Sequence, residues 1–67
     1  MHKVRVNGNK VNCLIAKQLM TNNELCQRAQ LSTSTVRAAI VGSPVSLITV
    51  GKLAKALGVE PEEIMLL

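Results

Sequence analysis

The side chains that could perform catalysis or bind a metal are few in this chain and poorly spaced for either. The 67 residues include one histidine, His2, two cysteines, Cys13 and Cys26, and four acids. A zinc site needs four ligands at suitable spacing, and a nucleophile needs a nearby base. The glutamates at 60, 62 and 63 follow one another closely, as is typical of a helix start whose dipole favours acids. We therefore expect no enzyme activity, no cofactor, no metal site and no small-molecule ligand.

Charge is distributed unevenly along the sequence. Residues 1–55 contain all eight Lys and Arg but one acid, Glu24, whereas residues 56–67 contain three Glu and no basic residue. A basic body with a net charge of +4 fits a polyanionic partner that faces one side. The chain has no Phe, Trp or Tyr, which argues against the aromatic platforms that bind single-stranded nucleic acid.

The two cysteines and the apolar runs indicate the compartment. Cys13 and Cys26 both fall on apolar faces, so we expect buried, reduced thiols. Reduced thiols indicate a reducing compartment. Residues 1–10 show no secretory signal, and no apolar run approaches the length of a membrane span. We therefore expect a cytoplasmic protein without membrane association.

The spacing of apolar residues predicts one small helical domain with an aliphatic core. Helices are predicted over 11–19, 22–30, 33–41 and 47–57, with a short fifth helix from Pro61. Asn9 or Asn12 could cap the first helix. The expected fold class is thus all-α, a compact four- to five-helix bundle of residues 11–67 preceded by an N-terminal arm of residues 1–10.

Helix caps give the clearest local signals. Thr21 and Glu24 match the T-x-x-E capping box, so the second helix should begin at Asn22. Ser32 and Ser46 are good N-caps for the third and fourth helices. Leu19 and Leu47 fall on the apolar faces of the first and fourth helices, where we expect them to be buried, and Ile64, Leu66 or Leu67 should fold back on the core.

The arm alternates valines with polar residues around Asn7-Gly8, which alone indicates a strand or small hairpin. An ordered extended arm is our preferred interpretation, and a flexible basic tail is the alternative. In either case Lys3 and Arg5 could enter a DNA groove.

Two short helices joined by about three residues form a helix-turn-helix motif. The small residues Cys26 and Ala29 allow the two helices to cross closely. The second of them can then expose its other face, including Arg37, to a DNA major groove about 12 Å wide.

Several segments in this order resemble the Cro/repressor (Xre-like) helix-turn-helix family. They are Leu25 to Val36, Gly42, and the LAKALGV segment of residues 53–59, while residues 61–64 are similar to the short helix that usually follows. The resemblance covers roughly residues 11–66 and implies a four- or five-helix bundle that binds specific DNA sequences, often as a dimer. Gln30 stands where the family usually has glycine, so a mildly strained left-handed residue is expected there.

The resemblance also implies where DNA contacts would lie. The candidate DNA-binding residues are Asn22, Ser32, Thr33, Ser34, Thr35, Arg37 and Ser43. Arg37 could bind a guanine or a phosphate. The hydroxyl residues could instead serve only as caps, and Asn22 could be an ordinary exposed residue. Lys10, Lys17 and Arg28 are possible phosphate contacts, with solvated surface charges as the alternative.

These observations predict a small transcriptional regulator, expected to be a repressor, that binds double-stranded DNA as a homodimer. The rival is a protein-interaction module that keeps the fold without reading DNA, since fold does not determine function. The apolar segments Ile40-Val41 and 64–67 motivate that rival, although they could equally form a homodimer seam.

Overall fold

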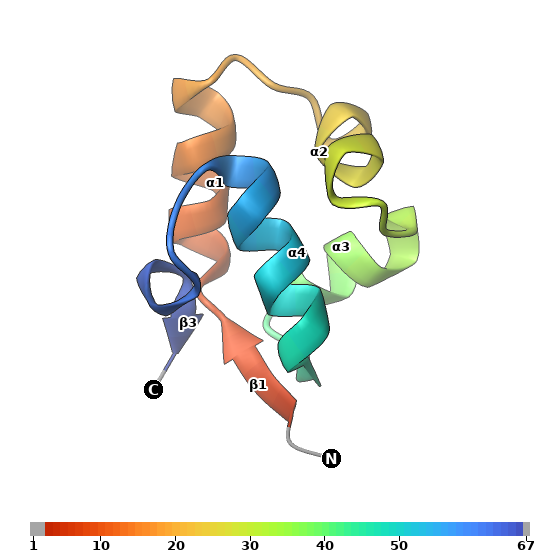
Figure 1. Cartoon of the computed structure of the whole chain (residues 1–67), viewed down its shortest axis with the longest axis vertical. Coiled ribbons are helices and arrows are strands. Elements are labelled where there is room, and N and C mark those ends of the chain that lie inside the picture. Colours follow the sequence, from red (N-terminus) through yellow and green to blue (C-terminus); the bar gives the residue numbers. More distant parts are fainter. Residues whose placement is uncertain (1–2, 67) are drawn as a thin grey trace.

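The computed structural model describes residues 3–66, which contain four α-helices and three short strands (Figure 1). Their order is β1 (Lys3–Val6), α1 (Gly8–Lys17), α2 (Asn22–Ala29), α3 (Thr33–Ile40), β2 (Val45–Ser46), α4 (Leu47–Leu57), the 3-10 turn η1 (Pro61–Glu63) and β3 (Met65–Leu66). None of these helices is long and apolar enough to cross a membrane.

The fold is mostly helical, as predicted, but the all-α, four- to five-helix expectation needs two corrections. The segment from Pro61 is a single 3-10 turn and not a fifth α-helix, because the N–H of Ile64 closes on the carbonyl of Pro61 at 3.1 Å. The chain then continues as β3, which pairs with β1.

The second correction is a small antiparallel sheet with strand order β2-β1-β3. β1 is its central strand and pairs Lys3 with Ser46 on one side and Arg5 with Leu66 on the other. Residues 3–6 of the arm are therefore ordered and extended, as preferred, with Val6 buried in the core, whereas residues 8–10 belong to α1. Both described ends of the chain lie together at the sheet (Figure 1).

α1 begins and ends earlier than predicted. The Oδ1 of Asn7, rather than Asn9 or Asn12, caps it by accepting from the N–H of Lys10 at 3.2 Å. Leu19 was expected on the buried face, but it follows the helix with a φ of 52° and is 91% exposed. The N–H of Met20 returns to the carbonyl of Ile15 at 3.0 Å, so Met20 is buried in place of Leu19.

Some of the other burial predictions are confirmed and others are wrong. Cys26 is buried as expected, but Cys13 is exposed because it lies on the outer side of α1. Leu47 was predicted to be buried but is 49% exposed, because it begins α4 at the surface. Ile64 is fully buried and Leu66 is exposed. Leu67 and His2 lie outside the described residues.

Candidate nucleic-acid interface

The turn between α2 and α3 is fixed by local hydrogen bonds. Thr21 and Glu24 form the predicted capping box, with the Thr21 N–H donating to Glu24 Oε1 at 3.0 Å and the Glu24 N–H donating to Thr21 Oγ1 at 3.1 Å. Gln30 adopts the expected left-handed conformation, with a φ of 57°. The N–H of Leu31 then closes on the carbonyl of Cys26 at 3.0 Å, and α3 follows after Ser32.

The same capping box favours the ionised form of its glutamate. The backbone N–H of Thr21, and then its side-chain hydroxyl, hold the pKa of Glu24 below its ordinary value. Arg28 on the next turn of α2 lowers that pKa a little further. The first turn of α2 therefore carries a negative charge near its positive end.

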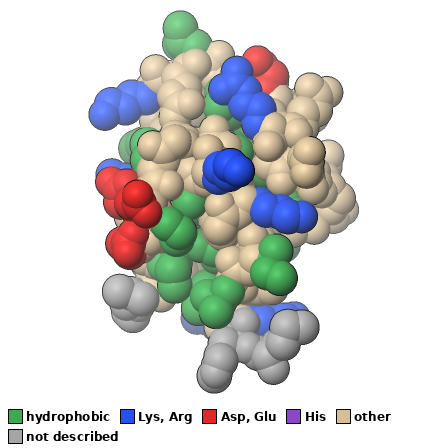
Figure 2. All heavy atoms as spheres, viewed as in Figure 1, with side chains coloured by type: hydrophobic (Ala, Val, Ile, Leu, Met, Phe, Trp, Pro, Cys, Tyr) green, Lys and Arg blue, Asp and Glu red, His purple; other side chains and the backbone are tan. Residues whose placement is uncertain are grey.

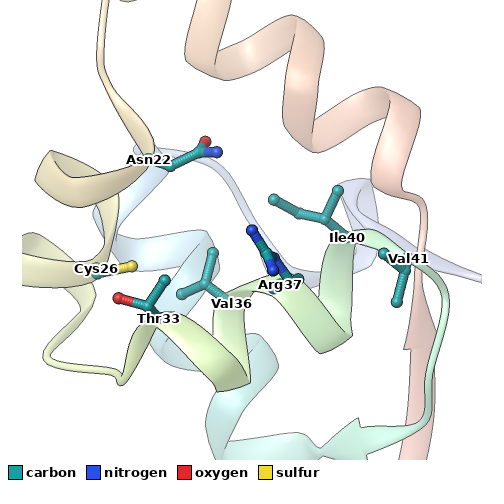
Figure 3. A pocket seen from close by; sticks show the side chains of 7 residues that line it. All are labelled: Asn22, Cys26, Thr33, Val36, Arg37, Ile40 and Val41. Carbon is teal, nitrogen blue, oxygen red and sulfur yellow. The ribbon is translucent and has the colours of Figure 1, made fainter.

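A hollow of about 210 Å³ lies between the start of α2 and α3 (Figure 3). It brings together three predicted site residues, Asn22, Thr33 and Arg37, from two different helices. Figure 3 shows the Arg37 side chain rising from α3 into the opening on the side where Asn22 lies. Within residues 3–66 none of these three side chains makes a hydrogen bond, so their polar atoms are available to a partner.

The hollow also has apolar walls, and none of their residues was among the candidate DNA-binding residues. Cys26, Val36, Ile40 and Val41 line it. Cys26 is buried as expected, and Val36 is buried as well. These residues belong to the core and also line a surface hollow. Helical periodicity identifies core positions, but it does not show which of them lie at the edge of the core, beneath such a hollow.

On the opposite side of α3 lies a second, shallow hollow of about 370 Å³. Ser34 and Thr35 line it together with residues of β1, β2 and α4. The Thr35 hydroxyl is engaged with the Ser32 hydroxyl at 2.8 Å, and Ser32 also accepts the Thr35 N–H at 3.2 Å. Ser32 and Thr35 thus cap α3, whereas the side chain of Ser34 makes no hydrogen bond within the described residues.

The remaining predicted contacts line neither of these two hollows. Ser43 is exposed, and its backbone N–H closes the end of α3 by donating to the Ala38 carbonyl at 2.9 Å. Lys10 and Lys17 are exposed on α1.

Arg28 instead lines a third hollow with Lys52 and Lys55, which shares no lining residue with the other two. Figure 2 shows basic side chains over α4 and its border with α2, and acidic ones over η1. Lys52 and Lys55 were not among the candidate contacts, although their three-residue spacing in a predicted helix places both on one side of it.

A helix-turn-helix family model (HTH_3, Xre-like) matches residues 14–64. The chain belongs to this family. The match includes all of α2 and α3, together with α4 and η1, and it confirms the Cro/repressor resemblance. This helix-turn-helix protein has no match among curated protein sequences.

Two solved structures resemble the helix-turn-helix protein closely. One is the restriction-modification controller protein C.AhdI from Aeromonas hydrophila, with 32% identity, a TM-score of 0.76, and coverage of 84% of this chain and 86% of that one. The other is Streptomyces albus HEPD, solved with 2-hydroxyethylphosphonate and Fe(II), with 32% identity and a TM-score of 0.72. That match covers 84% of this chain but 13% of HEPD. The family and the controller protein support a role in DNA-binding transcription regulation.

Proposed function

We propose that this protein binds specific sequences of double-stranded DNA by placing α3 in the major groove. The observation that carries the proposal is the hollow between α2 and α3, where Asn22, Thr33 and Arg37 present unpaired polar atoms beside one exposed helix. A recognition helix needs such a face, flanked by a helix N-terminus that can meet a phosphate.

Each residue of this face suits a different kind of contact. Asn22 is the first residue of α2, so its amide and the helix N-terminus can approach one phosphate together. Arg37, the only charged residue of α3, can donate bidentately to a guanine or clamp a phosphate. The Thr33 and Ser34 hydroxyls can bond base edges, and the Thr33 methyl group can contact a thymine methyl group.

We further propose that the protein acts as a repressor and as a homodimer. A bound dimer would occupy two half-sites about one DNA turn, roughly 34–36 Å, apart, and so exclude other proteins from that segment. Exposed apolar side chains at the start of α4, Leu47 and Ile48, offer a surface for the second copy. The controller protein it resembles is, by its own description, a controller of a restriction-modification system.

An NMR titration of the full chain with duplex DNA at two salt concentrations tests this proposal. We expect shifts centred on Asn22, residues 32–37 and Ser43, and binding that weakens steeply with salt as condensed counterions are released. Shifts confined to β3 and η1, or no shifts, would overturn the proposal.

Replacing the single cation of α3 refines the test. Arg37→Ala should weaken binding to the preferred sequence by roughly 1–3 kcal/mol if Arg37 reads a guanine. A phosphate contact would instead weaken all sequences about equally. Binding that is unchanged in Arg37→Ala would remove Arg37 from the interface.

The rival function is a protein-interaction module. The apolar walls of the first hollow favour it, since Val36, Ile40 and Val41 could receive an apolar side chain. HEPD also contains a similar fold as a small part of a chain solved with an enzyme substrate. A partner bound in this way would give affinity that rises or stays constant with salt, because apolar burial is not screened.

We propose that the protein acts by binding alone and not by catalysis. Within the described part of the chain, no three of its His, Cys, Asp and Glu side chains gather closely enough to hold a metal ion. Within residues 3–66, the hydroxyls of the nucleophile candidates Thr33 and Ser34 make no hydrogen bond to a side chain that could act as a base.

A further inference from the structure

α3 stands as a ridge between two hollows that share no residue. The first contains Asn22 and Arg37 on the α2 side, and the second contains Ser34 and Ala38 on the side of the sheet. A helix that lies in a DNA major groove has a phosphate backbone on each of its sides. With α3 in a major groove, the two hollows would face the two backbone strands that border it.

The two sides of the ridge differ in what α3 itself supplies. Arg37 lines the first hollow, and it is the only charged residue of the helix. On the second side α3 contributes Ser34, Thr35 and Ala38, none of which is charged. A phosphate there would have no cation from α3, so any charged contact must come from another element.

β1 supplies that cation. Side chains alternate along a strand, and Val4 and Val6 pack toward the core, so Lys3 points outward. Antiparallel pairing sets Lys3 opposite Ser46, immediately after the loop that leaves α3. Lys3 lines the second hollow with Ser34, Ala38 and Pro44, and no acidic residue lines it. Arg5 points the same way but does not line this hollow.

We propose that Lys3 binds a DNA phosphate on the side of α3 opposite Asn22, so that β1 is part of the nucleic-acid interface. This rests on the proposed binding of duplex DNA by α3. The sheet fixes the position of Lys3 relative to α3, because β1 is hydrogen-bonded to β2 next to the end of that helix. Lys3 thus acts from a fixed strand and does not depend on ordering a tail.

The test compares three variants of the full chain with the unmodified protein. Lys3→Gln removes the charge, Lys3→Arg keeps it, and Lys55→Gln removes an equal charge from the separate hollow beside α2 and α4. Affinity for a short duplex of mixed sequence is measured by fluorescence anisotropy over a range of salt concentrations. Phosphate contacts do not depend on sequence, so no operator is needed.

We expect Lys3→Gln to weaken binding several-fold at low salt and to reduce the slope of log affinity against log salt by about one. Lys3→Arg and Lys55→Gln should retain the affinity and slope of the unmodified protein. Thermal unfolding of Lys3→Gln should be unchanged, since Lys3 is exposed.

An unchanged slope in Lys3→Gln, or an equal loss in Lys55→Gln, would overturn the proposal. Arg37→Ala separates this failure from that of the proposed function. If the unmodified protein binds duplex DNA and Arg37→Ala weakens it, while Lys3→Gln does not, then α3 reads DNA and Lys3 takes no part. If the unmodified protein does not bind duplex DNA, the proposed function itself fails.

Discussion

Glu24 holds two adjacent backbone segments in one capping box. Its carboxylate accepts from the Thr21 N–H, and its own N–H donates to the Thr21 hydroxyl. The ionised carboxylate strengthens the hydrogen bond that it accepts, and the geometry of the box supports the second hydrogen bond. The start of α2, where Asn22 lies, therefore depends in part on the charge of one exposed side chain.

This dependence predicts a stability that falls in acid. Hydrogen bonds from Thr21 lower the pKa of Glu24 in the folded protein, so ionisation favours folding. Its contribution is present above the pKa of the unfolded state and is lost as pH falls through the lower, folded pKa. In Glu24→Gln, whose amide oxygen can still cap, we expect a smaller decrease in stability between neutral pH and about pH 3. Urea unfolding of both proteins at the two pH values measures this. Equal decreases would mean that Glu24 is not a source of the pH dependence.

At the scale of single residues, local signals were predictable and burial at helix ends was not. Thr21, Glu24 and Ser32 were identified because a cap and its partner lie three residues apart in sequence. Leu19 was expected to be buried, but Met20 is buried instead, because the residue at which α1 ends decides which of the two faces the core. The candidate DNA contacts themselves stay predictions until binding is measured.

All four helices of the described chain end in the same way. A residue of positive φ follows the helix, and the N–H of the next residue donates a hydrogen bond to the carbonyl five positions before it. The left-handed residues are Leu19, Gln30, Gly42 and Gly58. Two of the four are not glycine, although a left-handed conformation costs a non-glycine residue roughly 1–2 kcal/mol. Hydrogen bonds such as that from Val59 N–H to the Ala54 carbonyl at 3.0 Å, and packing of the residue that follows, offset this cost.

α1 and α3 approach closely at a position where only glycine fits. Gly8, the first residue of α1, lies against the carbonyl of Ile40, and a Cβ at this position would overlap that carbonyl. Ile40 also lines the first hollow, so this close approach helps to define the candidate site. Gly51 in α4 differs, since a Cβ there would meet no atom within 4 Å.

These two helical glycines give a matched pair. Gly8→Ala should lower the free energy of unfolding by roughly 1–3 kcal/mol, because α1 and α3 must separate. Gly51→Ala should raise it by about 0.5–1 kcal/mol, because alanine favours a helix and fits in open space. Chemical denaturation of both variants measures the difference. Stabilisation in both would show that α1 and α3 do not approach closely at Gly8.

Over the whole molecule, the outer side of α4 carries unpartnered apolar surface. Leu47 and Ile48 are 49% and 69% exposed, and Gly51 leaves space beside them. Figure 2 shows hydrophobic side chains gathered toward the start of α4, with basic side chains farther along the helix and acidic ones over η1. The sequence also allowed a homodimer seam at Ile40-Val41 and residues 64–67, but Ile64 is fully buried and so offers no surface to a second copy.

If a second copy covers this side of α4, Ile48→Asp should favour the monomer. Burying an isoleucine contributes about 1.5–3 kcal/mol and occurs twice in a two-fold interface, so association should weaken by roughly a hundredfold or more. Leu19→Asp is the control, since Leu19 is 91% exposed at the end of α1. Sedimentation equilibrium measures both. A chain that is monomeric at all concentrations, or dimers unaffected by Ile48→Asp, would exclude this interface.

The sheet was the part of the fold that the sequence did not reveal. The alternation of Val4 and Val6 indicated an extended segment, but β2 and β3 are two residues each and too short to show a period. Their pairing with β1 joins residues far apart in sequence, which local patterns do not encode. For the same reason Lys3 could not be assigned to the side of α3 from the sequence alone.

The central position of β1 also has a consequence for how the chain folds. Its pairing of Arg5 with Leu66 closes a loop of nearly the full chain length, whereas each helix and cap forms from neighbouring residues. Closing so long a loop has an entropic cost that no earlier local contact offsets. We therefore expect the helices to form first and the two ends of the chain to join late. Such long-range closure raises the contact order, so folding should be slower than in helical bundles of this size and closer to that of mixed α/β domains.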